Sequence, residues 1–277
     1  MGDSIADGLL QMFKMILTPN LLGGISDLSK TVTQFNGSAY SFATSINSTV
    51  IKPIAATILA IVLVLELARI GARFDGDQKM GVQQVASAII KAVLVVVAIQ
   101  NVDLILKAIN EVSDRAIVAI SASNATSGQI ALPSKDTIEG AGMLQQLGTF
   151  GVLLIPFLLS VAASIVVKII VFVRFAEIYV LTAAATLPLV FMAHPETKSI
   201  SVGYLKKYAS AVLQGVVLLV IVKIFTYFKV TPAFTKITSD NLLGTTAEQF
   251  PALILGSVVF IVLVVSSGKL ARALVGE

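Results

Sequence analysis

The stretch VVKIIVFVRFAEIYVL, residues 166–181, decides the fold of this chain. It lies within an apolar run, residues 149–193, and yet it carries Lys168, Arg174 and Glu177. Charged side chains are costly inside a bilayer, so this stretch is either a turn between two membrane passes or a charged element held within the membrane protein. The choice depends on how often the rest of the chain crosses the membrane.

Apolar residues are abundant and charged residues are few. Of the 277 residues, 56% are hydrophobic and 13% are charged, and the mean hydropathy is +0.91. A soluble domain of ordinary composition has about 25% charged residues. Several runs approach the length of about 20 apolar residues that a membrane-spanning helix needs. The composition therefore predicts an all-α, polytopic helical membrane protein.

Polar stretches between the apolar runs divide the chain into four parts. These are an extracytoplasmic head (1–52), a first transmembrane hairpin (53–106), an extracytoplasmic loop (107–148) and a C-terminal transmembrane bundle (149–277). Pro53 suits the start of the first membrane helix, where its missing N–H costs nothing. Residues 104–120 repeat apolar side chains at helical spacing, which predicts a further helix beside the loop.

The head begins with the pattern of an amphipathic helix. Its apolar residues recur on one helical face: Ile5, Leu9, Met12, Phe13 and Ile16. A helix of this kind is predicted to lie along a membrane surface, with its apolar face in the lipid.

Lysine and arginine are concentrated in three short segments. Residues 69–81, 194–208 and 269–277 together hold as many of these cations as three much longer segments, 1–52, 107–148 and 229–250. Because short cytoplasmic loops are enriched in Lys and Arg, the short segments are predicted to be cytoplasmic. The protein would then be a multi-pass protein of the cell membrane, with its N-terminus outside and its C-terminus in the cytoplasm. The basic loop of this arrangement contributes Lys198, Lys206 and Lys207.

This topology requires an odd number of crossings between residues 148 and 194. One helix, residues 149 to about 172, would cross, and the remainder of the run would form a re-entrant or half-pass segment. The sequence thus predicts five passes plus this segment, in which Thr182, Thr186 and Pro188 are candidate polar channel residues. The alternative is a tight helical hairpin that turns at residues 174–177, which gives six passes.

Four charged residues within the apolar runs are candidate members of intramembrane ion pairs. Glu66 and Lys91 belong to neighbouring antiparallel helices and could meet. Arg174 and Glu177 are three residues apart on one helical face and could pair with each other. Ionisable groups at this depth suggest function, whereas a lock between helices or snorkelling to the interface would be purely structural.

The sequence contains no catalytic or cofactor motif. It has no cysteine, one histidine (His194) and no Walker-type phosphate loop. We therefore expect no enzyme activity, no metal and no cofactor. Energy for any transport would come from a partner or from an ion gradient.

Residues 33–70, TQFNGSAYSFATSINSTVIKPIAATILAIVLVLELARI, resemble a known family. The likeness rests on Phe35-Asn36, Ala39-Tyr40, Pro53-Ile54-Ala55 and Leu65-Glu66-Leu67. With these residues the chain is similar to the TrbL/VirB-six-like polytopic inner-membrane subunits of type IV secretion (conjugation) systems, of the kind found in Gram-positive conjugative elements.

The resemblance implies a membrane channel or scaffold subunit of a conjugative type IV secretion system, through which relaxase-bound single-stranded DNA leaves the donor cell. It also implies a homo-oligomer in membrane lipid that contacts a VirB-four-type ATPase, a VirB-eight-type protein and the coupling protein. A role in lining the channel would bring Lys91, Thr182 and Thr186 to the DNA. The alternatives are a structural membrane anchor or holin-like pore, and an ion-coupled secondary transporter.

Overall fold

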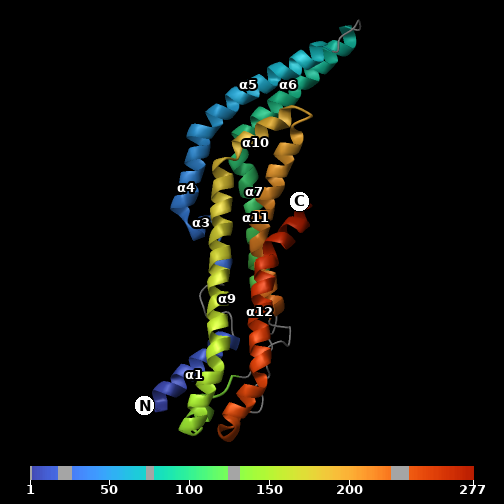
Figure 1. Ribbon diagram of the computed structural model, residues 1–277. Helices are drawn as coiled ribbons and strands as arrows, with labels where there is room; N and C mark the ends of the chain where they lie inside the picture. The colour runs from blue at the N-terminus through green and yellow to red at the C-terminus, as the bar shows by residue number, and fades with distance from the viewer. Residues whose placement is uncertain (1, 18–26, 73–77, 124–131, 226–236) are drawn as a thin grey trace. The chain divides into compact units, whose positions relative to one another are not determined.

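The computed structural model describes residues 2–17, 27–72, 78–123, 132–225 and 237–277 (Figure 1). These ranges contain helices and no strand, which confirms the all-α prediction. The α-helices are α1 (Gly2–Leu17), α3 (Val32–Phe35), α4 (Gly37–Ile46), α5 (Lys52–Ala72), α6 (Gln78–Gln100), α7 (Val102–Ala122), α8 (Lys135–Glu139), α9 (Met143–Ala183), α10 (Thr186–Val190), α11 (Lys198–Phe225) and α12 (Leu242–Val275). The described ranges also contain a π-helix (Asn47–Ile51) and the 3-10 helices Phe191–Ala193 and Ser239–Asn241.

Five helical runs in these ranges are long and apolar enough to cross a membrane. They are Gly37–Ala72, Val82–Gln100, Met143–Ala183, Lys198–Phe225 and Ser239–Val275. Their number agrees with the five predicted passes. The helix predicted at 104–120 is present as α7. The predicted loops 69–81, 107–148 and 229–250 lie partly outside the described residues.

The chain forms two compact units. The first unit consists of Met1–Ser29, Ile117–Phe172 and Gly215–Ser267, and the second of Lys30–Ala116, Val173–Gln214 and Gly268–Glu277. Each unit has its own set of packed helices.

The core of the first unit is built around α1. Leu9 and Phe13 of this helix are fully buried and pack with Ile138 of α8 and Leu153 of α9. The predicted amphipathic helix is therefore present, but its apolar face lies against protein and not along a membrane surface. An amphipathic pattern indicates only that one face of the helix is shielded from water, and it does not distinguish burial in a protein core from burial in lipid.

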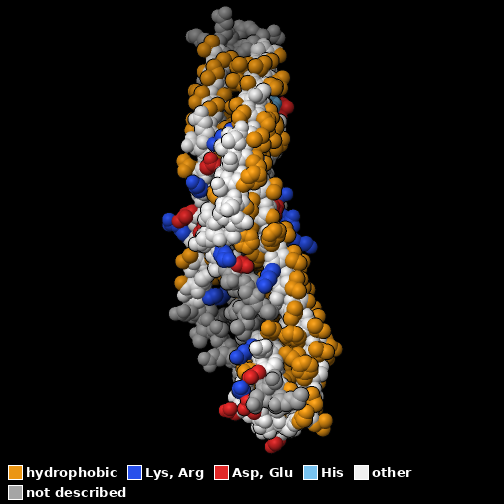
Figure 2. All heavy atoms as spheres, turned by 90° about the vertical axis from the view of Figure 1, so that its left-hand side faces the viewer, with side chains coloured by type: hydrophobic (Ala, Val, Ile, Leu, Met, Phe, Trp, Pro, Cys, Tyr) orange, Lys and Arg blue, Asp and Glu red, His pale blue; other side chains and the backbone are white. Residues whose placement is uncertain are grey.

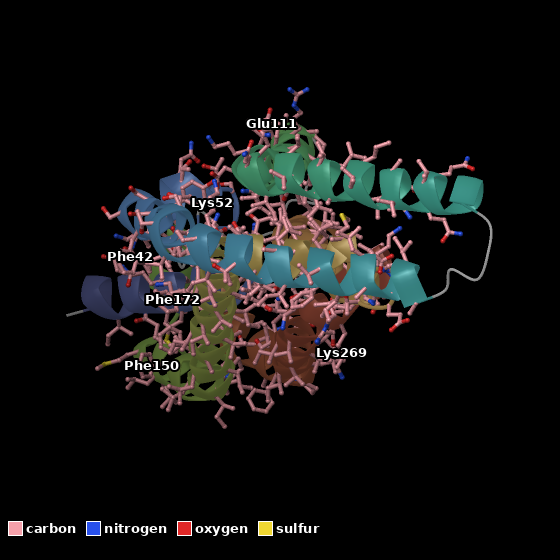
Figure 3. All side chains as sticks on the ribbon, turned by 90° about the horizontal axis from the view of Figure 1, so that it is seen from above. Phe42, Lys52, Glu111, Phe150, Phe172 and Lys269 are labelled. Atoms are coloured by element: carbon pink, nitrogen blue, oxygen red, sulfur yellow. The ribbon has the colours of Figure 1, made fainter. Side chains whose placement is uncertain are left out.

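In the second unit, α5 and α6 form a hairpin of two neighbouring helices (Figures 1 and 3). The short helix α10 packs against both of them. The outer faces of the hairpin are apolar, as with Ile61 and Val64 of α5 and Ile90 and Leu94 of α6, and hydrophobic side chains dominate this region in Figure 2. Exposed apolar faces of this kind suit contact with lipid or with other membrane helices.

The first membrane-length run begins earlier than predicted. It starts at Gly37, where the Asn36 side chain accepts a hydrogen bond from the Ala39 N–H at 3.0 Å, and it continues through the π-helix into α5. Pro53 thus lies inside a continuous helical run. In an α-helix a proline ring clashes with the carbonyl four residues earlier, and the wider π turn before Pro53 gives that carbonyl room.

The stretch at residues 166–181 lies wholly inside α9. This helix continues past Phe172, where the crossing helix was predicted to end, to Ala183. A hairpin turning at residues 174–177 is contradicted by this continuity. The apolar run then continues through α10, whose five residues span only about 8 Å and cannot cross a bilayer, and it ends in the 3-10 helix Phe191–Ala193.

Candidate functional site

Four charged or ionisable side chains of the second unit form an ion cluster beside the α5–α6 hairpin. The cluster consists of Glu66 and Arg69 of α5 and His194 and Glu196 of the segment before α11. Glu66 Oε2 lies 2.5 Å from His194 Nδ1 and 3.6 Å from Arg69 Nη1. Glu196 closes the ring, because its carboxylate lies 3.3 Å from Arg69 Nη2 and 3.7 Å from His194 Nε2. The ion cluster therefore ties α5 to the segment that leads into α11.

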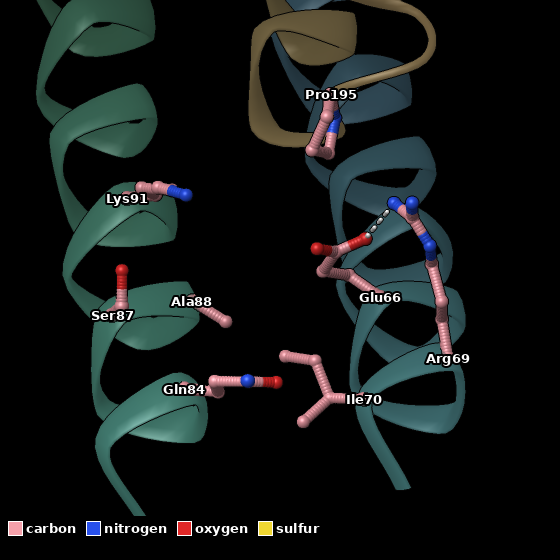
Figure 4. A pocket seen from close by; sticks show the side chains of 8 residues that line it. All are labelled: Glu66, Arg69, Ile70, Gln84, Ser87, Ala88, Lys91 and Pro195. Carbon is pink, nitrogen blue, oxygen red and sulfur yellow. Dashed lines mark ion pairs between the residues drawn. The ribbon is translucent and has the colours of Figure 1, made fainter. Parts of the chain in front are cut away.

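A cavity of about 290 Å³ adjoins the ion cluster (Figure 4). It is lined by Glu66, Arg69, Ile70, Gln84, Ser87, Ala88, Lys91 and Pro195. The structure thus brings Glu66 and Lys91 to one cavity, as their neighbouring helices predicted. Among the described residues it records no ion pair between them, because Glu66 is paired with Arg69 and His194.

A second cavity, of about 390 Å³, also has Lys91 in its lining. Lys91, Leu94, Val95, Met192, Ala193, Pro195 and Lys198 line it. Lys91 and Pro195 border both cavities, so the two are neighbours. The lining of the first cavity is mainly polar, whereas the lining of the second cavity is mainly apolar and contains two lysines. Lys198, predicted as part of a basic cytoplasmic loop, is here a side chain of this cavity at the start of α11.

Arg174 is buried in the core of the second unit. Only 2% of the residue is exposed. Its Nε and Nη2 donate to the carbonyls of Ala211 and Val212 of α11, at 3.2 and 3.4 Å, and its guanidinium lies 4.7 Å from the ring centroid of Phe175. Its Nη1 has no hydrogen-bond partner in the described part of the chain. The buried guanidinium of Arg174 is therefore stabilised by hydrogen bonds to two carbonyls, by the ring of Phe175 and by longer-range electrostatic interactions.

The acidic group that compensates Arg174 electrostatically is Asp114 of α7. Burial raises the pKa of Asp114, the nearby carboxylate of Glu111 raises it further, and Arg174 partly offsets both effects. Ser113, the neighbour of Asp114, donates to the Val212 carbonyl at 3.1 Å. α7 and α9 thus converge on the same turn of α11.

Arg174 and Glu177 do not pair with each other. Glu177 Oε1 lies 3.8 Å from Lys207 Nζ, and Lys206 Nζ donates to the Gly276 carbonyl at 2.8 Å. The predicted pair satisfied helical spacing, but α11 offers each side chain another partner. Two of the three predicted basic-loop lysines are thus engaged within the second unit, while Lys198 borders the apolar cavity.

The candidate channel residues of the half-pass segment lie at the end of α9 and in α10. Thr182 and Thr186 are buried, and their hydroxyls donate to the carbonyl of Ile178 and to Asn47 Oδ1 at 2.8 and 2.7 Å. Pro188 is half-buried, and its carbonyl accepts from Ser201 Oγ at 2.6 Å. These polar groups have partners within the chain, and their role in lining a channel stays a prediction.

Sequence reasoning missed several residues of these sites, among them Asp114, Glu196, His194 and Asn47. His194 was noted only as the single histidine of the sequence, yet it bonds Glu66. Asn47 was given no structural role, yet it is fully buried at the start of the π-helix and accepts from both the N–H and the hydroxyl of Thr186. The sequence did hold a signal for Asn47, since a polar amide two turns before a long apolar run needs a partner once it is buried.

The residues behind the family resemblance also lie in the second unit. Phe35 stacks on Phe175 of α9 with a centroid distance of 4.1 Å, and Tyr40 lies beside Tyr179 at 6.5 Å. Tyr179 in turn donates to the Val32 carbonyl at 2.8 Å. These contacts fix α3 and α4 against the C-terminal part of α9.

A family model supports the resemblance. The model of the TrbL/VirB6 plasmid conjugal transfer like protein matches residues 22–186, which include α3 to α9, Glu66, Lys91 and Arg174. No curated protein and no solved structure gives a significant match. The family match covers more than half of the chain, and the chain has five helices of membrane-spanning length. The chain therefore belongs to the TrbL/VirB6 plasmid conjugal transfer-like family and is a multi-pass membrane subunit of a conjugative type IV secretion system.

Proposed function

We propose that the chain is a channel or scaffold subunit that helps to pass relaxase-bound single-stranded DNA across the cell membrane. The observation that carries this proposal is the family match over residues 22–186 in a chain with five membrane-length helices. The sequence contains no Walker-type phosphate loop, so the chain contributes no ATP hydrolysis of its own in this scheme. An ATPase of the same secretion system supplies the energy.

The proposed subunit acts as a homo-oligomer and in contact with other secretion-channel subunits. On α5, Ala56 and Ala60 are exposed and four residues apart, next to exposed Ile61 and Val64. Small residues at this spacing let two membrane helices approach closely. This face of α5 is therefore the one that the proposal assigns to contact between copies. A VirB-four-type ATPase, a VirB-eight-type protein and the coupling protein are the other proposed partners.

The first test is crosslinking of DNA in transit. Donor cells in active mating are treated with formaldehyde, the tagged chain is purified under denaturing conditions, and the transferred strand is quantified against a plasmid that is not mobilised. We expect enrichment of the transferred strand that depends on the relaxase. A relaxase-deficient donor is the matched control, because it contains the same DNA without a strand in transit.

The other outcomes are equally specific. Transfer lost on deletion of the chain, without any enrichment of DNA, would make the chain a scaffold that holds the channel together. Transfer that proceeds normally after deletion would contradict the proposal as a whole.

The proposal includes a topology with the N-terminus outside and the C-terminus in the cytoplasm. The chain has no native cysteine, so Ser199→Cys, an exposed position at the start of α11, gives a single thiol. We expect an impermeant maleimide to label it only after the cells are permeabilised. Leu144→Cys, an 84% exposed position at the start of α9, is the counterpart and should be labelled on intact cells. Labelling of Ser199→Cys on intact cells would exclude this topology.

A further inference from the structure

The cavity of about 390 Å³ between α6 and the segment before α11 combines two kinds of chemistry. Its walls are apolar, from Leu94 and Val95 of α6 and from Met192 and Ala193. Its two charged side chains are Lys91 and Lys198. A site with apolar walls and two cations suits a ligand that has an apolar body and an anionic end.

The two lysines have no neutralising partner recorded in the part of the chain that the structure describes. Among the described residues, neither is recorded in an ion pair or a hydrogen bond, and both are exposed. Glu66, which lines the neighbouring cavity together with Lys91, is held by Arg69 and His194, and Glu196 also lies against Arg69. An uncompensated lysine near the middle of a membrane helix is costly unless an anion meets it.

The surroundings of this cavity identify the class of ligand. Lys91 lies within the membrane-length run Val82–Gln100, and Leu94, one turn further along, is 63% exposed. Apolar side chains that are exposed on a membrane helix suit contact with lipid, so lipid molecules are available to fill the cavity. The N–H groups at the start of α11 next to Lys198 further favour an anion.

We propose that this cavity binds an anionic phospholipid. Its phosphate lies between Lys91 and Lys198, and an acyl chain lies along Leu94 and Val95. Basic pockets between membrane helices recognise lipid head groups in this way. The proposed site does not depend on the path of the DNA. Binding of the lipid would make the packing of the α5–α6 hairpin against the segment before α11 sensitive to the lipid composition of the membrane.

The test uses the fact that the chain contains no tryptophan. A Leu94→Trp variant of the full chain therefore carries a single tryptophan reporter at the rim of the cavity. It is reconstituted in phosphatidylcholine vesicles that contain a minor fraction of either brominated phosphatidylglycerol or brominated phosphatidylcholine. Bromine quenches tryptophan on contact, so the two quenching curves give the relative affinity of the two lipids. Val262→Trp, 58% exposed on α12, is the matched control reporter.

We expect phosphatidylglycerol to quench the Leu94→Trp reporter selectively and the Val262→Trp reporter without preference. Adding Lys91→Gln should weaken the preference about fivefold, and Lys91→Gln with Lys198→Gln about thirtyfold. Lys91→Arg should retain it, because the charge remains. This charge-retaining variant separates loss of binding from loss of folding, which circular dichroism of each variant checks independently.

Three results would overturn the proposal. The first is equal quenching of the Leu94→Trp reporter by both lipids. The second is a preference that survives removal of both lysines. The third is a preference that inorganic phosphate or a single-stranded oligonucleotide abolishes, since either result would assign the two lysines to a water-soluble anion.

Discussion

Replacement of Arg174 by methionine is expected to lower the free energy of unfolding by about 3 kcal/mol. The side chain is almost completely buried, donates to two carbonyls of α11 and compensates Asp114 electrostatically. Methionine fills much of the same volume but leaves Asp114 half-buried without its cation. The midpoint of unfolding of the detergent-solubilised protein in an SDS titration, followed by circular dichroism, measures the effect.

Lys168→Met is the matched control for this prediction. Lys168 lies on the same helix and is exposed, and its side chain has no recorded hydrogen bond or ion pair among the described residues. Its replacement should leave the midpoint unchanged. Combining Arg174→Met with Asp114→Asn should recover part of the loss, because the uncompensated carboxylate is removed as well. An Arg174→Met protein that unfolds at the wild-type midpoint would show that the contacts of Arg174 contribute little to stability.

Asn47→Leu is expected to destabilise the second unit by a similar amount, about 3 kcal/mol. α10 has no side-chain cap of its own, and Asn47 supplies the missing acceptor from another helix, at 3.3 Å from the Thr186 N–H and 2.7 Å from its hydroxyl. Leucine removes this acceptor and leaves two buried donors without a partner. The same SDS titration measures the loss, and the frequency of conjugative transfer measures its consequence for assembly.

Two further variants define what Asn47 does. Ser48→Ala changes an exposed neighbour on the same π turn and should have little effect. Thr186→Val removes only the hydroxyl, so it should cost less than Asn47→Leu, since the N–H of residue 186 keeps its acceptor. If Thr186→Val proves as damaging as Asn47→Leu, the role of Asn47 as a cap for α10 is contradicted.

The architecture of the chain could be predicted because it depends on composition and periodicity. Runs of apolar residues gave five membrane-length helices, and the spacing in residues 104–120 gave α7. The boundaries were predicted less well, because helices continue beyond the apolar segments as long as caps and packing support them. α9 is the clearest case, because this helix continues through its charged residues. Arg174 has partners on α11, and Glu177 pairs with Lys207.

The partners of the charged residues could not be predicted in the same way. Helical spacing shows which side chains share a face, and the short connection in the sequence indicates that Glu66 and Lys91 lie on neighbouring helices. Neither of these signals shows which third segment of the chain packs against that face. His194 is far from Glu66 in the sequence and reaches it only because the segment before α11 packs against the hairpin. Likewise, the apolar stripe of α1 required a covering surface, but only the folded chain shows that the first unit provides it.

A π turn is equivalent to an α-helix that carries one inserted residue. The turn at Asn47–Ile51 therefore makes the gene sensitive to the deletion of a single codon at this place. Loss of one codon within it would leave an unbroken α-helix and would rotate α4 by about 100° around the axis that it shares with α5. Phe35 and Tyr40 would then turn away from Phe175 and Tyr179. A change in length within this turn is therefore expected to disrupt the packing of α3 and α4 against α9 even where every side chain that makes a contact is retained.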